Sequence, residues 1–231
     1  MQTTSGTLPS CSVIEAGFGG SLFLLALSVA PFTLAGELHA NVKTSAGGPV
    51  ADAVVVLIPL DGQVSTARPE PAVVDQIDKQ FVPYVKPILV GSEISFPNKD
   101  NIRHQVYSFS PAKRFELPLY REYPAPPVLF DKAGIVTLGC NIHDWMIAYV
   151  YVSDSPWFAK TGDEGTAKVA DLPDGKYRVR VWHPQMDATG EDTIREVAIT
   201  GQGNVEAIWQ ITLKPELRPR RAPLGREQGY R

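Results

Sequence analysis

The stretch LGCNIHDWM (residues 138–146) places a thiol, an imidazole and a thioether within one short segment. Cys140, His143 and Met146 follow the spacing C-x2-H-x2-M, in a chain of 231 residues with 2 cysteines and 3 methionines. In a regular strand Cys140 and His143 would point to opposite faces, so the two side chains converge only where the chain turns between them. A thiolate, two imidazoles and a weak axial thioether are the ligands of a mononuclear blue-copper site. A second imidazole must therefore come from elsewhere in the chain.

His104 is the candidate for the second imidazole. It follows the polar segment FPNKDNIR and begins the alternating segment HQVYSF, in which it shares a face with Val106. In GIVTLGC the same alternation places Cys140 with Val136 and Leu138. Both candidate ligands therefore lie on apolar faces that we expect to point inward. We predict one mononuclear copper ion with the ligands His104, Cys140, His143 and Met146.

Other interpretations of these residues stay open. Cys140 and Met146 could be core residues, because an isolated buried cysteine behaves as a small hydrophobe. A catalytic Cys–His pair is a further interpretation, since a thiol nucleophile needs a neighbouring base. Such a pair gives no reason for the methionine or for the second histidine. His39 and His183 lack comparable neighbours and are expected not to be ligands, and Trp145 belongs either to a docking patch or to the packing over the site.

The composition predicts an all-β fold of short strands. The chain contains 20 prolines and 19 glycines, and no soluble part of it has a convincing helical period. Its formal net charge of −3 is close to balance, so nothing global indicates a nucleic-acid partner or an anionic membrane surface.

The N-terminal region is typical of a secretory signal. The uncharged run SLFLLALSVAPFTLA is about fifteen residues long, short of the roughly 20 that a membrane span needs. It ends in the small-residue pattern Thr33-Leu34-Ala35, a plausible cleavage site, although residues 1–20 carry no Lys or Arg. We expect a signal peptide (1–35), a periplasmic location and no stable membrane span after cleavage; a retained anchor or a buried core segment are the alternatives. Cys140 would then be the single thiol of the mature protein.

The rest of the chain divides by pattern. Residues 36–62 contain two strands, and residues after about 165 alternate as a hairpin series, including Tyr177, Val179 and Val181 on one face. The expected regions are the first strands of an accessory sandwich, a copper domain, the remainder of that sandwich and a disordered basic tail: 36–68, 76–154, 155–214 and 215–231. Insertion of the copper domain into one sandwich is favoured, because neither flanking part alone has enough strands for a core. Two consecutive domains or one enlarged barrel are the alternatives.

The central residues carry a resemblance to a known family. VGSEISFPNKDNIRHQVYSFS followed by FDKAGIVTLGCNIHDWMIAYVYV resembles a cupredoxin, with a ligand loop as short as that of amicyanin. The same segments are similar to exported cupredoxin-like proteins called methylamine utilization proteins. VKTSAGGPVADAVVVLIP and TGDEGTAKVADLPDGKYRVRVWHP are similar to a carboxypeptidase regulatory-like, or transthyretin-like, sandwich. Gln105 departs from the cupredoxin pattern, where Asn often follows the first histidine and braces the ligand loop.

The resemblance implies a cupredoxin-like Greek-key sandwich or barrel next to a small immunoglobulin- or transthyretin-like sandwich. It implies a periplasmic copper protein. We predict that it transfers one electron through a type 1 site to redox partner proteins, and we do not expect an enzyme, because no substrate pocket or acid/base pair is visible in the sequence. The alternatives are a copper-carrying or copper-storing protein without redox turnover, and a cell-envelope interaction module with a structural metal.

Overall fold

The chain is all β, as the composition predicts. This computed structural model describes residues 2, 35–62, 67–121, 125–186, 191–201 and 203–215. The expected signal peptide and basic tail lie almost entirely outside these residues. In the described residues the one helical element is the short 3-10 helix η1 (Glu191–Thr193), and no helix is both long and apolar enough to cross a membrane. The chain from Thr33 on forms one compact unit.

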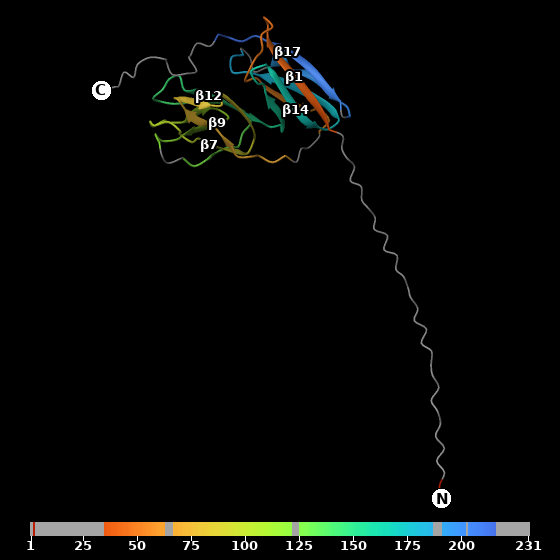
Figure 1. The fold of residues 1–231 in the computed structure, drawn as a ribbon, viewed down its shortest axis with the longest axis horizontal. Helices are drawn as coiled ribbons and strands as arrows, with labels where there is room; N and C mark the ends of the chain where they lie inside the picture. The colour runs from red at the N-terminus through yellow and green to blue at the C-terminus, as the bar shows by residue number, and fades with distance from the viewer. Residues whose placement is uncertain are drawn as a thin grey trace, which may run out of the picture. The chain divides into compact units, whose positions relative to one another are not determined.

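Two sheets enclose an apolar core that uses strands from both ends of this unit. The three-stranded sheet has the order β14 (Thr166–Leu172), β1 (Gly36–Thr44), β17 (Asn204–Ile211). The four-stranded sheet has the order β13 (Trp157–Lys160), β2 (Val54–Pro59), β15 (Gly175–Trp182), β16 (Arg195–Ile199). Figure 1 shows the orange β1 beside β14 and the blue β17, to which it pairs antiparallel and parallel respectively. Early and late parts of the sequence therefore form the same sheets.

The predicted inward faces of this sandwich are correct, but the predicted hairpin series forms only in part, because β15 pairs with β16 whereas β14 does not pair with β15. Tyr177, Val179 and Val181 are fully buried in the core. The turn between Leu172 and Gly175 does not join neighbouring strands, because β14 pairs with β1 whereas β15 pairs with β2 and β16. Alternation identifies the buried face of a strand, but it does not identify the neighbouring strand when long-range pairing competes with a local turn.

The strands that flank the predicted ligands form a second set of sheets around their own core. The five-stranded sheet has the order β6 (Val85–Leu89), β12 (Ile147–Ser153), β11 (Gly134–Gly139), β8 (Tyr107–Ser110), β9 (Lys113–Glu116). The smaller sheets are β10 (Val128–Phe130), β7 (Ser92–Ser95), β3 (Ala72–Val73), and the hairpin β4 (Asp75–Ile77), β5 (Gln80–Val82). Val136, Leu138 and Cys140 point into this core, as their alternation predicts.

A third apolar cluster joins the two sets of sheets. It combines buried residues of β2 and β15 with residues of β6 and β12. The Trp182 ring lies 5.5 Å from that of Tyr151 and 6.0 Å from that of Tyr149, between ring centroids. The Ser155 hydroxyl also donates a hydrogen bond to the carbonyl of Leu57, and both groups are buried. Aromatic packing and this hydrogen bond therefore connect the two sets of sheets, in addition to the covalent connections of the backbone.

We expect a fragment of residues 155–214 to be unfolded. It would lack β1, which pairs with β14 and β17, and β2, which pairs with β13 and β15. Loss of both strands opens the core and leaves backbone groups of their neighbours unpaired. Amide dispersion in an NMR spectrum is the measurement, with the chain 36–215 as control. A well-dispersed, cooperatively melting fragment would mean that this segment is an independent domain.

Candidate metal centre

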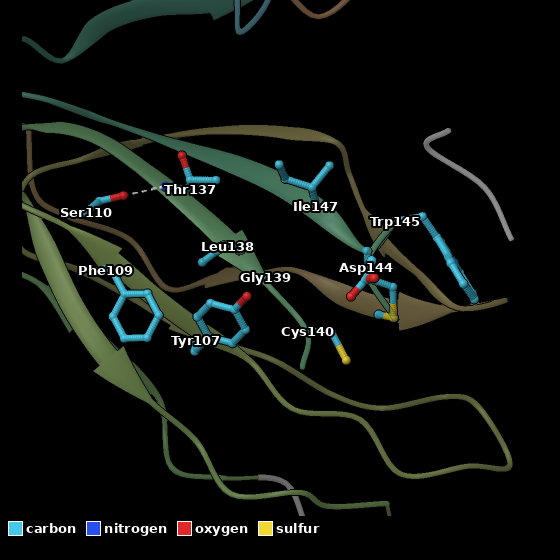
Figure 2. Close-up of a pocket in the computed structure, with 11 residues that line it drawn as sticks. Tyr107, Phe109, Ser110, Thr137, Leu138, Gly139, Cys140, Asp144, Trp145 and Ile147 are labelled. Atoms are coloured by element: carbon cyan, nitrogen blue, oxygen red, sulfur yellow. Dashed lines mark hydrogen bonds between the residues drawn. The ribbon is translucent and has the colours of Figure 1, made fainter. Parts of the chain in front are cut away.

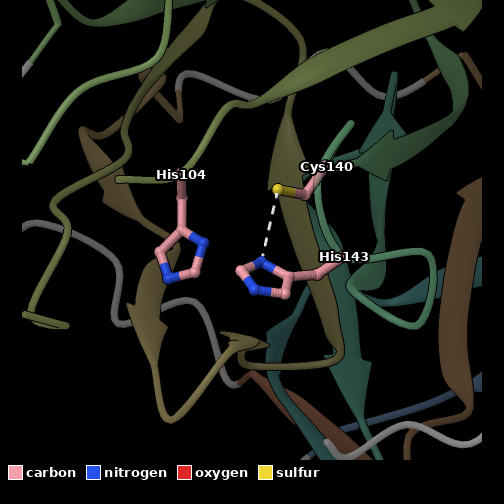
Figure 3. Close-up of side chains that lie close together, drawn as sticks. All are labelled: His104, Cys140 and His143. Carbon is pink, nitrogen blue, oxygen red and sulfur yellow. Dashed lines mark hydrogen bonds between the residues drawn. The ribbon is translucent and has the colours of Figure 1, made fainter. Parts of the chain in front are cut away.

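Three predicted ligands converge at one end of the five-stranded sheet. His104, Cys140 and His143 each offer a donor atom, and these atoms all lie within 4.8 Å of one another. The Cys140 sulfur lies 4.0 Å from Nδ1 of His143, and the two imidazole centroids are 4.9 Å apart. Figure 3 shows both rings and the sulfur facing a common point. Among the described residues, these three form the one group of His, Cys, Asp or Glu side chains whose donor atoms lie close enough together to share an ion.

The local backbone explains this convergence. Cys140 directly follows β11 and continues its inward face, and it is 3% exposed. After Cys140 the chain turns, and the N–H of Met146 donates to the carbonyl of His143 at 2.9 Å. His104 precedes β8 and exchanges backbone hydrogen bonds with Tyr120 at 3.1 and 3.0 Å. Bends at Asn141 and Ile142 change the chain direction between Cys140 and His143, as the convergence of the two side chains requires.

Met146 lies at the end of the same turn but outside the three-donor group. It is 1% exposed and belongs to the same apolar core as Cys140. Both residues also line a hollow of about 780 Å³ on the ligand end of the sheet. Figure 2 shows Cys140 in this hollow between the rings of Tyr107 and Trp145. An axial role for the Met146 thioether stays a prediction.

His104 contacts the carboxylate of Asp100, a residue that was not among the predicted site residues. Its Nε2 lies 2.7 Å from Oδ2 of Asp100, four residues earlier, while its side chain is fully buried. Its Nδ1 is buried and has no hydrogen-bond partner among the described residues. A hydrogen bond at Nε2 leaves the Nδ1 lone pair available for a metal, which is the usual arrangement of a ligating histidine. The orphaned Nδ1 therefore fits a ligand role.

The electrostatics of the cluster favour a thiolate. Burial acts to raise the pKa of Cys140, but the His104 ring and the backbone N–H groups of Gln105 and Ile142 outweigh it and lower this pKa. Burial lowers the pKa of His104, but the nearby Cys140 and Asp100 side chains raise it overall. The pKa of His143 is lowered by burial and then by the charge of His104. A thiolate is the form of cysteine that binds metals.

Gln105 does not brace the ligand loop with its side chain. Its amide donates to Oε1 of Glu116 at 2.7 Å, across the edge of the sheet. Its backbone N–H instead contributes to the lowered pKa of the Cys140 thiol. The side-chain bond that Asn makes in many cupredoxins is therefore replaced here by a main-chain contact.

Trp145 packs over the site. Its ring centroid lies 5.1 Å from that of His143, and its indole N–H donates to the carbonyl of Lys79 at 3.1 Å.

His39 and His183 lie outside the cluster. His39 contacts Glu37 at 3.0 Å on β1, and the buried His183 accepts a hydrogen bond from the N–H of Gln185.

The sequence matches no protein-family model and no curated protein. Part of the chain is similar to solved cupredoxin-type structures. The Cu-containing nitrite reductase from Thermus scotoductus SA-01 is 23% identical with a TM-score of 0.35, over 42% of this chain and 25% of that one. A reduced Cu(I) amicyanin variant is 18% identical with a TM-score of 0.33, over 44% of this chain and 99% of that one. A purple cupredoxin from Nitrosopumilus maritimus is 19% identical with a TM-score of 0.28, over 36% and 99%. This chain spans about a quarter of the nitrite reductase, and these values assign neither a family nor an activity.

Replacement of Met146 by Leu tests its axial role. We expect the copper-loaded variant to keep its colour and to have a higher reduction potential, because Cu(II) loses a donor and the site becomes more apolar, which disfavours the more highly charged ion. Voltammetry and the visible spectrum are the measurements. Met186→Leu is the matched control, since Met186 is partly buried against the other core. An unchanged potential and spectrum in Met146→Leu would make Met146 a core residue alone.

Proposed function

We propose that the chain is a cupredoxin-like copper protein that carries one electron at a mononuclear type 1 site. His104 and His143 would supply the equatorial nitrogens, Cys140 the thiolate, and Met146 a weak axial contact. The observation that carries this proposal is the convergence of His104, Cys140 and His143, whose donor atoms all lie within 4.8 Å of one another.

The donor spacing supports a single small ion. Thiolate and imidazole donors lie about 2.0–2.3 Å from a bound ion such as zinc. Two donors of the same ion are therefore separated by no more than the sum of their bond lengths, about 4.4 Å for a thiolate and an imidazole. The Cys140–His143 separation of 4.0 Å falls within this limit. The mixture of thiolate, imidazole and thioether favours copper, although zinc would compete for the same donors.

The chain's own residues would give the site its character. Copper supplies the one-electron redox change, and the protein holds its donors in place. Cys140 at 3% exposed and the fully buried His104 keep water from the strong ligands. A catalytic Cys–His pair would leave the second histidine and the methionine without a role, whereas the proposed metal site uses both. We therefore propose an electron carrier and not an enzyme.

The surface beside His143 is suited to a redox partner protein. Ile142 is 49% exposed, Leu119 48% and Ile102 37%, and all three line one hollow with His143. Arg103 and Arg121 line the same hollow. We propose that a partner with an apolar centre and carboxylates around it docks here, which would bring its redox group close to His143. Apolar contact would hold the pair together while the charges orient it.

The cellular setting and domain boundaries belong to the same proposal. We propose export to the periplasm through the signal at residues 1–35, and a relationship to the exported methylamine utilization proteins. We also propose that residues 76–154 form a copper domain inserted into a carboxypeptidase regulatory-like sandwich of residues 36–68 and 155–214. The pairing of Leu57 with Trp157 supports the insertion, because the chain leaves and re-enters the sandwich on neighbouring strands.

Copper titration of the purified protein tests the metal centre. We expect one copper per chain and an intense visible band from thiolate charge transfer that a reductant bleaches reversibly. Cys140→Ser should abolish the band, because a hydroxyl cannot replace the thiolate. His39→Gln, a histidine outside the cluster, is the control and should keep it.

Three results would contradict the electron-carrier proposal in different ways. A blue Cys140→Ser variant would place the site elsewhere. Rapid transfer of the copper to a chelator without redox turnover would favour a copper-carrying or copper-storing protein. A colourless metal that is needed for folding would favour an envelope module with a structural ion.

The docking surface is tested by electron self-exchange between two copies. Ile142→Lys should slow the exchange by about tenfold or more, because it places a charge in the apolar contact and adds to the arginines beside it. NMR line broadening in mixtures of the oxidised and reduced protein measures the rate. Ile208→Lys is the matched control, since Ile208 is 54% exposed on β17 in the other sheet system. Equal slowing in both variants, or in neither, would contradict this docking surface.

A further inference from the structure

Asp100 contacts two separate segments around the candidate site. Its side chain is 13% exposed, and Oδ2 lies 2.7 Å from Nε2 of the fully buried His104. Oδ1 accepts a hydrogen bond from the N–H of Asp78 at 2.6 Å, and Oδ2 accepts another from the N–H of Lys79 at 2.8 Å. These contacts hold the Asp100 carboxylate at the Nε2 side of the His104 ring, opposite Nδ1.

The turn that binds Asp100 is built to present two N–H groups. Asp78 and Lys79 join β4 to β5 and have φ values of 52° and 58°, the left-handed conformation of a tight hairpin turn. Successive N–H groups in such turns form a small concavity that binds an anion. Here that anion is the carboxylate of Asp100. Burial acts to raise the pKa of Asp100, but these N–H groups and the His104 ring lower it overall.

The same turn also contacts the other ligand segment. The carbonyl of Lys79 accepts the indole N–H of Trp145 at 3.1 Å, and the Trp145 ring lies beside that of His143. Asp100 belongs to the loop that leads into His104, whereas Trp145 belongs to the turn between His143 and Met146. The Asp78–Lys79 turn therefore links the two segments that carry all of the proposed ligands.

We propose that Asp100 is a positioning residue that orients His104 and biases the site toward the oxidised metal. This inference rests on the proposed copper function. Acceptance of the Nε2 proton fixes the tautomer with a free lone pair at Nδ1 and makes the ring a stronger donor. The negative charge behind the ring stabilises Cu(II) more than Cu(I), because Coulomb attraction grows with the charge of the ion. Asp100 thus lowers the reduction potential.

Asp100→Asn removes the negative charge behind His104 while an oxygen acceptor for its Nε2 proton is kept. The amide has nearly the shape of the carboxylate and keeps one oxygen acceptor, so the blue spectrum should remain. Loss of such an outer partner typically weakens metal binding by roughly 10–100-fold. We expect this loss mainly for Cu(II), so the potential should rise by about 59 mV for each tenfold difference between the two oxidation states. Voltammetry and competition titrations with both ions measure these effects.

Asp163→Asn is the matched control for charge. Asp163 is exposed in the loop before β14, so water and salt screen it and the potential should change little. Equal potentials and Cu(II) affinities in the wild type and Asp100→Asn, with blue copper in both, would overturn the role of Asp100 alone. A wild type that binds no copper would overturn the proposed function and this inference together.

A second measurement needs no variant. In the diamagnetic Cu(I) protein, the Nε2 proton of His104 should resonate far downfield, because a carboxylate accepts it at 2.7 Å. An Nε2 proton without this shift would overturn the proposed contact even where Asp100→Asn fails to fold.

Discussion

Burial of the Cys140 sulfur is the constraint on which the ligand end of the structure depends. A buried thiolate is costly unless hydrogen-bond donors or positive charge surround it. Here the His104 ring and the backbone N–H groups of Gln105 and Ile142 act together on a sulfur that is 3% exposed. Those groups come from the segment before β8 and from the bend after β11. Burial of the sulfur therefore brings together two segments far apart in the sequence.

The apolar core beside the five-stranded sheet supports that arrangement. Val136 and Leu138 are fully buried and continue the inward face that ends at Cys140. Because β11 pairs with β12 from Gly134 to Gly139, the two strands hold both ends of the ligand turn close together. The sulfur, His143 and Met146 thus lie on a turn anchored at each end in one sheet. This restricts how far the donors can move when the charge of a bound ion changes.

Sequence patterns predicted the features that depend on local geometry. Alternation identified the buried faces that carry His104 and Cys140, and the short spacing to His143 predicted the turn. The strand partners could not be predicted, because β1 and β14 are joined by pairing across more than a hundred residues. Asp100 was present in the quoted loop, and its spacing of four residues from His104 was the available signal. Its role depends on the Asp78–Lys79 turn, and no local pattern indicates that this turn lies beside it.

The outward face of β12 is covered along its middle and open at the end next to Ile147. At Ile147, next to the ligand turn, this face borders the hollow beside Cys140. Further along, Tyr149 and Tyr151 pack against Trp182 of β15 in the cluster between the two sets of sheets. The middle of the strand is thus covered by the chain's own aromatic residues, whereas its ligand end meets solvent near the half-buried His143. A redox partner that docks beside His143, as proposed, would therefore meet the end of β12 that the aromatic cluster leaves uncovered.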